Sequence, residues 1–156
     1  MRSSAFAALL VSLAATGCAG VGATHQADHA PAPSDGRVAV AFPEPMRTHT
    51  LANMRDHLLA LQEIQQALAD GAYERAADVA EKRLGMTSLR SHGAHDVARF
   101  MPEGMQAIGT EMHRSASRFA VEAANAGATG NVKPSLAALA RVMQQCVACH
   151  ASYRMK

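Results

Sequence analysis

The chain has 156 residues, of which 15 are Lys or Arg and 13 are Asp or Glu, and its formal net charge is +2 with histidine neutral. This length allows one domain once a leader and a tether are set aside. A charge this small, without a basic run, excludes nucleic acid as the expected partner.

Residues 1–17 are predicted to be a secretory signal peptide. A charged start is followed by an apolar stretch at 5–15 that is too short to span a bilayer. Residues 15–18 are similar to a bacterial lipoprotein cleavage site, which makes Cys18 a candidate for lipidation and for the chain's membrane contact. Cleavage after Ala23 is the alternative and would remove this cysteine. Both signals predict export to the periplasm.

Residues 18–45 are predicted to form a flexible tether. Four of the chain's six prolines lie here, together with several Gly and Ala, and the segment has no helical period. The folded domain is therefore expected to span residues 46–156.

From residue 46 onward the chain is rich in Ala, Leu, Met, Gln, Glu and Arg, which favours helix throughout. The first helix is predicted over about 44–70, where Gly71 provides the C-cap. Apolar residues recur along it at steps of three and four, which indicates one buried face. This predicted stripe consists of Leu51, Met54, Leu58, Leu61, Ile64 and Leu68.

Three further long helices are predicted. The second begins near Ala72 and is interrupted at Gly85, the third begins at Pro102, and the fourth has Pro134 in its first turn. The stretch 86–93 is ambiguous, and a short helix is expected around 94–101. The inward residues are predicted to be Tyr73, Ala76, Ala80 and Leu84 on the second helix, Met105, Ile108, Met112, Ser115 and Phe119 on the third, and Leu136, Leu139, Met143, Cys146, His150 and Tyr153 on the fourth. Short connections predict an all-α, antiparallel four-helix bundle.

Near the C-terminus, residues 146–150 read Cys-Val-Ala-Cys-His, and C-x-x-C-H is the attachment signature of c-type haem. The two cysteine sulfurs add to the porphyrin vinyl groups, and the adjacent imidazole ligates the iron. On a helix the three side chains project from one face. A thioredoxin-like redox pair is the alternative, but it needs a βαβ context. We therefore predict one covalent haem c, attached at Cys146 and Cys149 with His150 as the proximal iron ligand.

The ending C-x-x-C-H-x-x-Tyr-Arg on the last helix of a bundle resembles class II cytochromes c, the cytochrome c′ type. Residues 47–54 are similar to the Arg-x-x-x-(Leu/Met)-x-x-Met segment of that family, and the resemblance covers roughly 46–156, without a clear match at 86–101. It implies that Leu51 lies over the distal face of the haem and leaves the sixth iron position open to small gases such as NO and CO. It also implies that Arg47 lies near the haem propionates.

Arg154 is a second candidate for pairing with a haem propionate, because it lies one helical turn beyond His150. A solvated arginine at the helix C-terminus is the alternative, since the helix dipole already favours a cation there. Met54 is the candidate sixth ligand if the iron is six-coordinate. His49 and His57 are expected to be exposed.

His92 and His95 are spaced so that they can hold a metal, and His113 lies on the following helix. No third ligand is fixed by spacing, so a solvated pair in a loop is the expectation.

The predicted function is that of a periplasmic haem protein that binds small gases or exchanges electrons with a redox partner protein. One alternative is a low-spin, six-coordinate electron-transfer cytochrome, and another is a haem-free helical metal-binding or thiol protein. No nucleophile–base pair, phosphate loop or paired carboxylates occur at informative spacing, so an enzyme is not expected. Members of the resembled family often pair through their first two helices, which makes a homodimer a candidate assembly.

Overall fold

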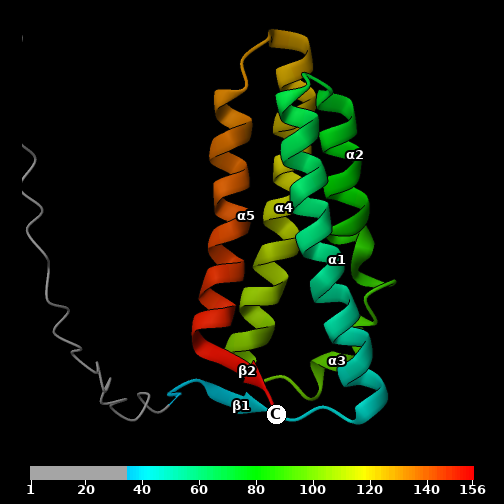
Figure 1. The fold of residues 1–156 in the computed structure, drawn as a ribbon, viewed down its shortest axis with the longest axis vertical. Coiled ribbons are helices and arrows are strands. Elements are labelled where there is room, and N and C mark those ends of the chain that lie inside the picture. The colour runs from blue at the N-terminus through cyan, green and yellow to red at the C-terminus, as the bar shows by residue number, and fades with distance from the viewer. Residues whose placement is uncertain (1–34) are drawn as a thin grey trace, which may run out of the picture. The chain divides into compact units, whose positions relative to one another are not determined.

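The structure, a computed structural model, describes residues 35–156 and consists mainly of helices (Figure 1). The predicted signal peptide, Cys18 and most of the predicted tether lie outside the described residues. In chain order the elements are β1 (Val38–Val40), α1 (Glu44–Ala69), α2 (Tyr73–Arg83), the 3-10 helix η1 (Met86–Leu89), α3 (Ala94–Ala98), α4 (Glu103–Thr129), α5 (Lys133–Ser152) and β2 (Tyr153–Met155). The prediction of a mostly helical chain is confirmed.

The helix ends follow the local signals in the sequence. Helix α1 begins directly after Pro43, and Gly71, just beyond its C-terminal end, has a φ of 70°. Helix α4 begins after Pro102 and ends at Gly130, whose φ is 72°. Proline suits a helix start because it has no N–H to leave unpaired, and glycine tolerates the left-handed backbone that follows a helix.

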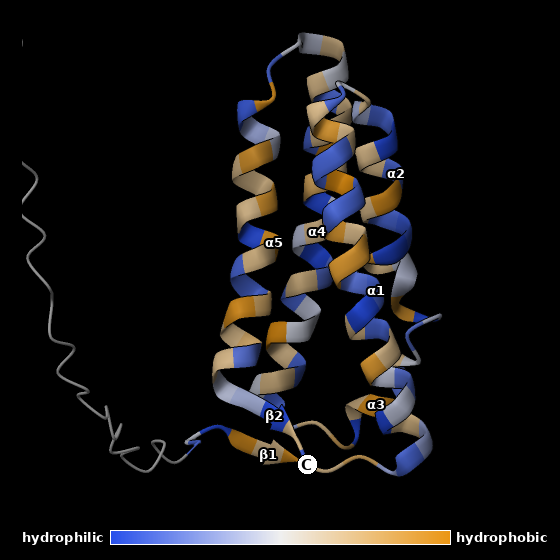
Figure 2. Cartoon of the chain, in the orientation of Figure 1, coloured by the Kyte–Doolittle hydropathy of each residue, from blue (hydrophilic) through white to orange (hydrophobic). Residues whose placement is uncertain are grey.

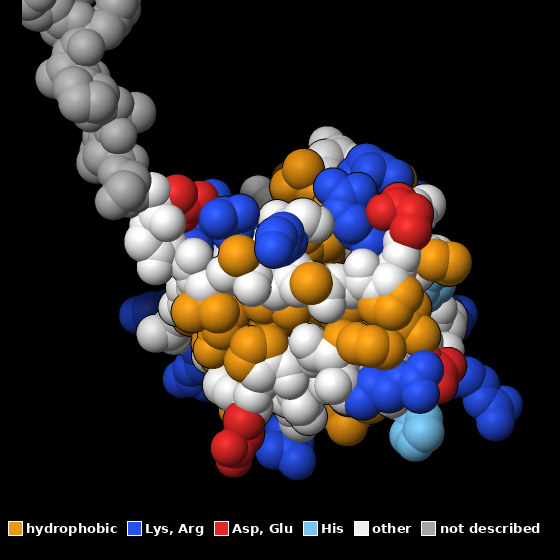
Figure 3. Space-filling view, turned by 90° about the horizontal axis from the view of Figure 1, so that it is seen from below, with side chains coloured by type: hydrophobic (Ala, Val, Ile, Leu, Met, Phe, Trp, Pro, Cys, Tyr) orange, Lys and Arg blue, Asp and Glu red, His pale blue; other side chains and the backbone are white. Residues whose placement is uncertain are grey.

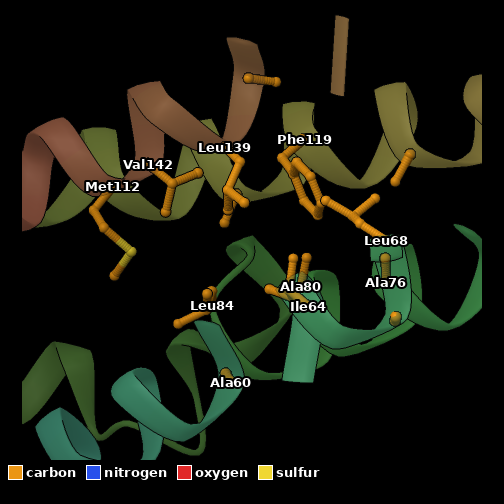
Figure 4. Close-up of a cluster of buried hydrophobic side chains, with 14 residues drawn as sticks. Ala60, Ile64, Leu68, Ala76, Ala80, Leu84, Met112, Phe119, Leu139 and Val142 are labelled. Carbon is orange, nitrogen blue, oxygen red and sulfur yellow. The ribbon is translucent and has the colours of Figure 1, made fainter. Parts of the chain in front are cut away.

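Helices α1, α2, α4 and α5 pack in sequence, α1 along α2, α2 along α4, and α4 along α5. By contrast, α1 and α5 make hardly any close backbone approach to each other. The main core lies between these helices, with Phe119 of α4 fully buried near its centre (Figure 4). Alanines at the contacts, such as Ala60, Ala76 and Ala80, are also fully buried and allow the helix backbones to approach closely.

The predicted buried face of α1 was wrong in part. Leu58 is 70% exposed, whereas Ala60 and Ile64 are fully buried. The face of α1 that packs against α2 and α4 is rotated away from the predicted leucine-rich stripe. Small residues occupy that face because they allow the helices to pack closely. One consequence is that His57, which was expected to be exposed, is buried.

The predicted stripe of α5 needs a similar correction. Leu136 and Met143 are 51% and 43% exposed, and the buried positions of α5 are Ser135, Ala138, Leu139 and Val142. His150, predicted to lie on the buried face, is exposed at the helix end. The chain then leaves the helical path, so that Tyr153 lies in β2.

A two-stranded parallel sheet, absent from the sequence prediction, joins the start of the described chain to its end. Val38 lies opposite Tyr153, and Val40 lies opposite Met155. Val40 and Phe42 form a second, smaller core with Val97, close to α3. The predicted irregular tether was therefore wrong for residues 38–40.

Polar residues recur along every long helix (Figure 2). Within residues 35–156, no helix combines the length and the apolarity needed to cross a membrane.

Candidate functional site

A cavity of about 580 Å³ lies at the end of the helices where the small sheet joins the termini of the described chain. Its walls come from α1, α4, the last turn of α5 with β2, and the segment that contains η1 and α3. Hydrophobic side chains gather across this end of the molecule, and Lys and Arg residues lie around its edge (Figure 3). The lining is mainly apolar, with contributions from Leu51, Met54, Val97, Met101, Met105 and Met112.

The C-x-x-C-H segment borders this cavity. Cys149 and His150 line it, while the half-buried Cys146 lies against the main core and donates a hydrogen bond from Sγ to the Val142 carbonyl at 3.6 Å. Neither cysteine forms a disulfide within residues 35–156. The backbone carbonyl of His150 accepts a hydrogen bond from Arg37 at 3.2 Å, which fastens the motif to the segment before β1.

The environment of the two cysteines does not favour a reactive redox pair. Burial raises the pKa of the Cys146 thiol, and burial together with the neighbouring Cys146 raises the pKa of Cys149. Both lie near the C-terminal end of α5, where the helix dipole disfavours negative charge. Catalytic thiol pairs have the opposite setting, because a helix N-terminus lowers the pKa of their nucleophile.

Helix α1 forms the wall opposite the motif. Leu51 and Met54 both line the cavity. Arg47 does not line it. Its Nε donates to the Lys156 carbonyl at 3.2 Å, and its guanidinium lies 3.8 Å from Glu44.

Two arginines border the cavity beside the motif. Arg154 lines it, and its Nε lies 3.3 Å from a carboxylate oxygen of Asp35. Arg37 also lines the cavity and pairs with Asp35 at 2.8 Å. Hydrogen bonds from Arg37 are the main cause that lowers the pKa of Asp35 to about 2. Arg37 was not predicted from the sequence, because only the short Val-Ala-Val run after it signals a strand.

Three histidines lie together at the inner end of the cavity. The ring centroids of His57 and His92 are 4.8 Å apart, those of His92 and His113 are 5.4 Å apart, and those of His57 and His113 are 6.3 Å apart. Burial lowers the pKa of all three, that of His57 to about 4. His95, which the sequence suggested as a partner of His92, is fully exposed and lies beside Asp96 instead.

Two buried polar atoms of α1 are left without a hydrogen-bond partner among the described residues, Thr50 Oγ1 and His57 Nε2. Both residues line the cavity. Buried polar groups are normally hydrogen-bonded, and an unpaired group at a cavity wall indicates that a ligand or water completes it. The cavity thus combines apolar walls with a few polar groups, as ligand sites commonly do.

No protein-family model, curated protein or solved structure matches this chain.

Proposed function

We propose that the chain is a covalent c-type haem protein of the cytochrome c′ type, a periplasmic four-helix bundle whose iron binds small gases. The observation that carries the proposal is that Cys149 and His150 line the same cavity as Leu51 of the opposite helix α1. A volume of about 580 Å³ is in the range of sites that hold an organic cofactor.

The residues around the cavity fit a haem. Cys146 and Cys149 would attach the porphyrin, and the imidazole of His150 would ligate the iron. Arg37 and Arg154 would pair with the propionates, because both guanidinium groups border the cavity beside the motif. Haem bound there would supply an iron that takes up a gas or cycles between two oxidation states.

The wall opposite the motif favours gas binding. Leu51 carries no donor atom, so it keeps water away from the cavity without ligating a metal. The scarcity of close backbone approaches between α1 and α5 supports the same proposal, since a flat cofactor between these helices would keep their backbones apart.

A six-coordinate electron carrier is the second candidate function, and one observation favours it. Met54 lines the cavity on the same helix as Leu51, and its thioether is a ligand that raises the potential of haem iron. The two functions therefore differ in which residue of α1 faces the iron.

Haem attachment is tested first. The full chain is produced in bacterial cells that carry the c-type haem attachment machinery, and haem retained after denaturation and acid–acetone extraction is measured by mass and by pyridine haemochrome. We expect one haem per chain. We expect Cys146→Ser and Cys149→Ser to lose one thioether each, with a corresponding shift of the haemochrome α band.

Val147→Ala provides the matched control. Val147 lies between the two cysteines and is 67% exposed, so its truncation should leave haem attachment unchanged. A full chain that carries no covalent haem under these conditions would refute the proposal and favour a haem-free metal-binding or thiol protein.

The optical spectrum then separates the two haem functions. A broad high-spin Soret band, with CO binding by the ferrous form, is expected. Sharp α and β bands without CO binding would instead identify the six-coordinate carrier.

A further inference from the structure

The three histidines at the inner end of the cavity come from separate parts of the chain. His57 is on α1, His92 follows η1, and His113 is on α4. Their rings approach one another without any direct hydrogen bond between them, and all three line the cavity. Three imidazoles brought together from distant segments need a common reason, since each alone would be better solvated at the surface.

In His92 and His113 the hydrogen bond at Nδ1 leaves Nε2 free. His113 donates from Nδ1–H to the Leu84 carbonyl at 2.7 Å, so its Nε2 carries the lone pair. The hydroxyl of Ser88 donates to the Gly85 carbonyl at 2.7 Å and can therefore accept from Nδ1–H of His92, which lies 3.4 Å away. A backbone carbonyl or hydroxyl that fixes the tautomer in this way is the usual support of a metal-ligating histidine.

The third ring supplies an independent observation. Nε2 of His57 is buried and has no hydrogen-bond partner within residues 35–156. The residue as a whole is more than nine-tenths buried. An orphaned imidazole nitrogen is costly unless something binds it. The neighbouring Asp56 does not complete it, because both carboxylate oxygens of Asp56 are bonded to Arg83.

The spacing of the rings suits one small cation. Imidazoles that bind Zn²⁺ at ~2.0–2.1 Å in a tetrahedral arrangement have ring centroids about 5 Å apart. Two of the three observed separations, 4.8 and 5.4 Å, are close to that value, and the third is 6.3 Å. Within residues 35–156 no three His, Cys, Asp or Glu side chains stand in positions that could hold a metal ion as they are, so the three rings would have to rotate and move closer together for a metal to bind.

We propose that His57, His92 and His113 form a site for a divalent transition-metal ion, Zn²⁺ or Cu²⁺, with the fourth coordination position facing the cavity. Three neutral imidazoles with one open position are the ligand set of such sites. The site uses none of the C-x-x-C-H residues, although it borders the same cavity. His57 lies about 9 Å beyond Leu51 along α1.

The test is metal binding by the untagged full chain. Zn²⁺ binding is measured by calorimetry, and the nitrogen hyperfine splitting of bound Cu²⁺ is measured by electron paramagnetic resonance. We expect one Zn²⁺ per chain and a Cu²⁺ signal split by three nitrogens. His92→Gln should weaken Zn²⁺ binding at least about 100-fold, because even the loss of an outer partner costs 10–100-fold.

His95→Gln is the matched control. His95 lies close to His92 in the sequence but is fully exposed and outside the cavity lining, so its loss should change neither the affinity nor the splitting. His92 is only half-buried, so His92→Gln is expected to fold, and far-ultraviolet circular dichroism verifies that it does.

Three results would overturn the proposal. They are the absence of stoichiometric Zn²⁺ binding by the full chain, equal weakening in His92→Gln and His95→Gln, and a Cu²⁺ signal without three nitrogens. Haem attachment is measured on the same samples, so a failure of the metal site is distinguished from a failure of the haem proposal.

Discussion

Val38 of β1 lies opposite Tyr153 of β2 in parallel register. Strand β2 directly follows α5, the helix that carries the C-x-x-C-H motif near its C-terminal end. This pairing brings the start of the described chain to the end of α5. The backbone N–H of Lys156 donates to the Val40 carbonyl at 3.0 Å, and Arg37 bonds the carbonyl of His150. The segment before α1 therefore fixes the position of the motif at the cavity.

The small core under this sheet is expected to contribute measurably to stability. Phe42 is buried there, and its ring centroid lies 6.5 Å from that of Phe100. Phe42→Ala should lower the free energy of unfolding by about 3 kcal/mol, since it removes a buried ring and leaves a cavity. Urea denaturation followed by circular dichroism provides the measurement.

The control for this prediction is Val38→Ala, in the same segment. Val38 is 53% exposed, so its truncation should change stability by less than about 0.5 kcal/mol. Equal effects of the two substitutions would mean that the segment before α1 is not packed as described.

The sequence predicted the helices well because their ends are encoded locally. Gly71 and Pro102 act through their own backbone, so no knowledge of the fold is needed to place them. The sheet could not be predicted in this way. Val38–Val40 is a three-residue strand whose partner lies more than a hundred residues away, and no periodicity develops over so short a run.

The buried faces were predicted less well, since counting leucines does not reveal where helices approach closely. Ala60 is fully buried against the core, whereas Leu58 on the same helix is largely exposed. Ala60→Leu is therefore expected to destabilise the protein by about 1–3 kcal/mol through overpacking. Thermal denaturation measures the effect.

Ala52→Leu serves as the comparison for Ala60→Leu. Ala52 is exposed on the same helix, and leucine is itself a good helix former, so stability should hardly change. A neutral Ala60→Leu variant would contradict the close helix contact.

The residues of the candidate site also differ in how far they could be predicted from the sequence. Residues 146–150 are contiguous, so the haem prediction needed no knowledge of the fold. The partners of His92 could not, because His57 and His113 reach it from two distant helices. Arg37 was missed for a similar reason, since its place beside Arg154 depends on the unpredicted sheet.

Stability is expected to fall in mild acid because of the buried histidines. Burial lowers the pKa of His57 from 6.5 to about 4, with smaller contributions from His92 and His113, while Asp56 opposes the shift and Arg83 adds to it. Between these values the unfolded chain binds a proton that the folded chain does not, so protons favour unfolding. About 3 kcal/mol contributed by His57 should be present above pH 6.5 and lost progressively as the pH falls toward 4.

Urea denaturation from pH 7.5 to 4.5, in the presence of a chelator, measures this dependence. His57→Leu removes one titrating group and should make the pH profile shallower, since His92 and His113 still titrate. His95→Gln should leave the slope unchanged, since His95 is exposed. A profile with the same slope in His57→Leu and the full chain would contradict the assignment to His57.

The cavity wall formed by α1 gives the sharpest test of how this helix would face the proposed haem. Leu51 and Met54 lie on neighbouring turns of the same helix, and both line the cavity. If the iron faces Leu51, Leu51→Met places a thioether opposite His150, which should convert a high-spin spectrum to a low-spin one and abolish CO binding by the ferrous form. Met54→Leu should then leave both the spectrum and CO binding unchanged. The reverse pattern, in which Met54→Leu opens the iron to CO, would assign the sixth position to Met54 and identify the protein as a six-coordinate electron carrier.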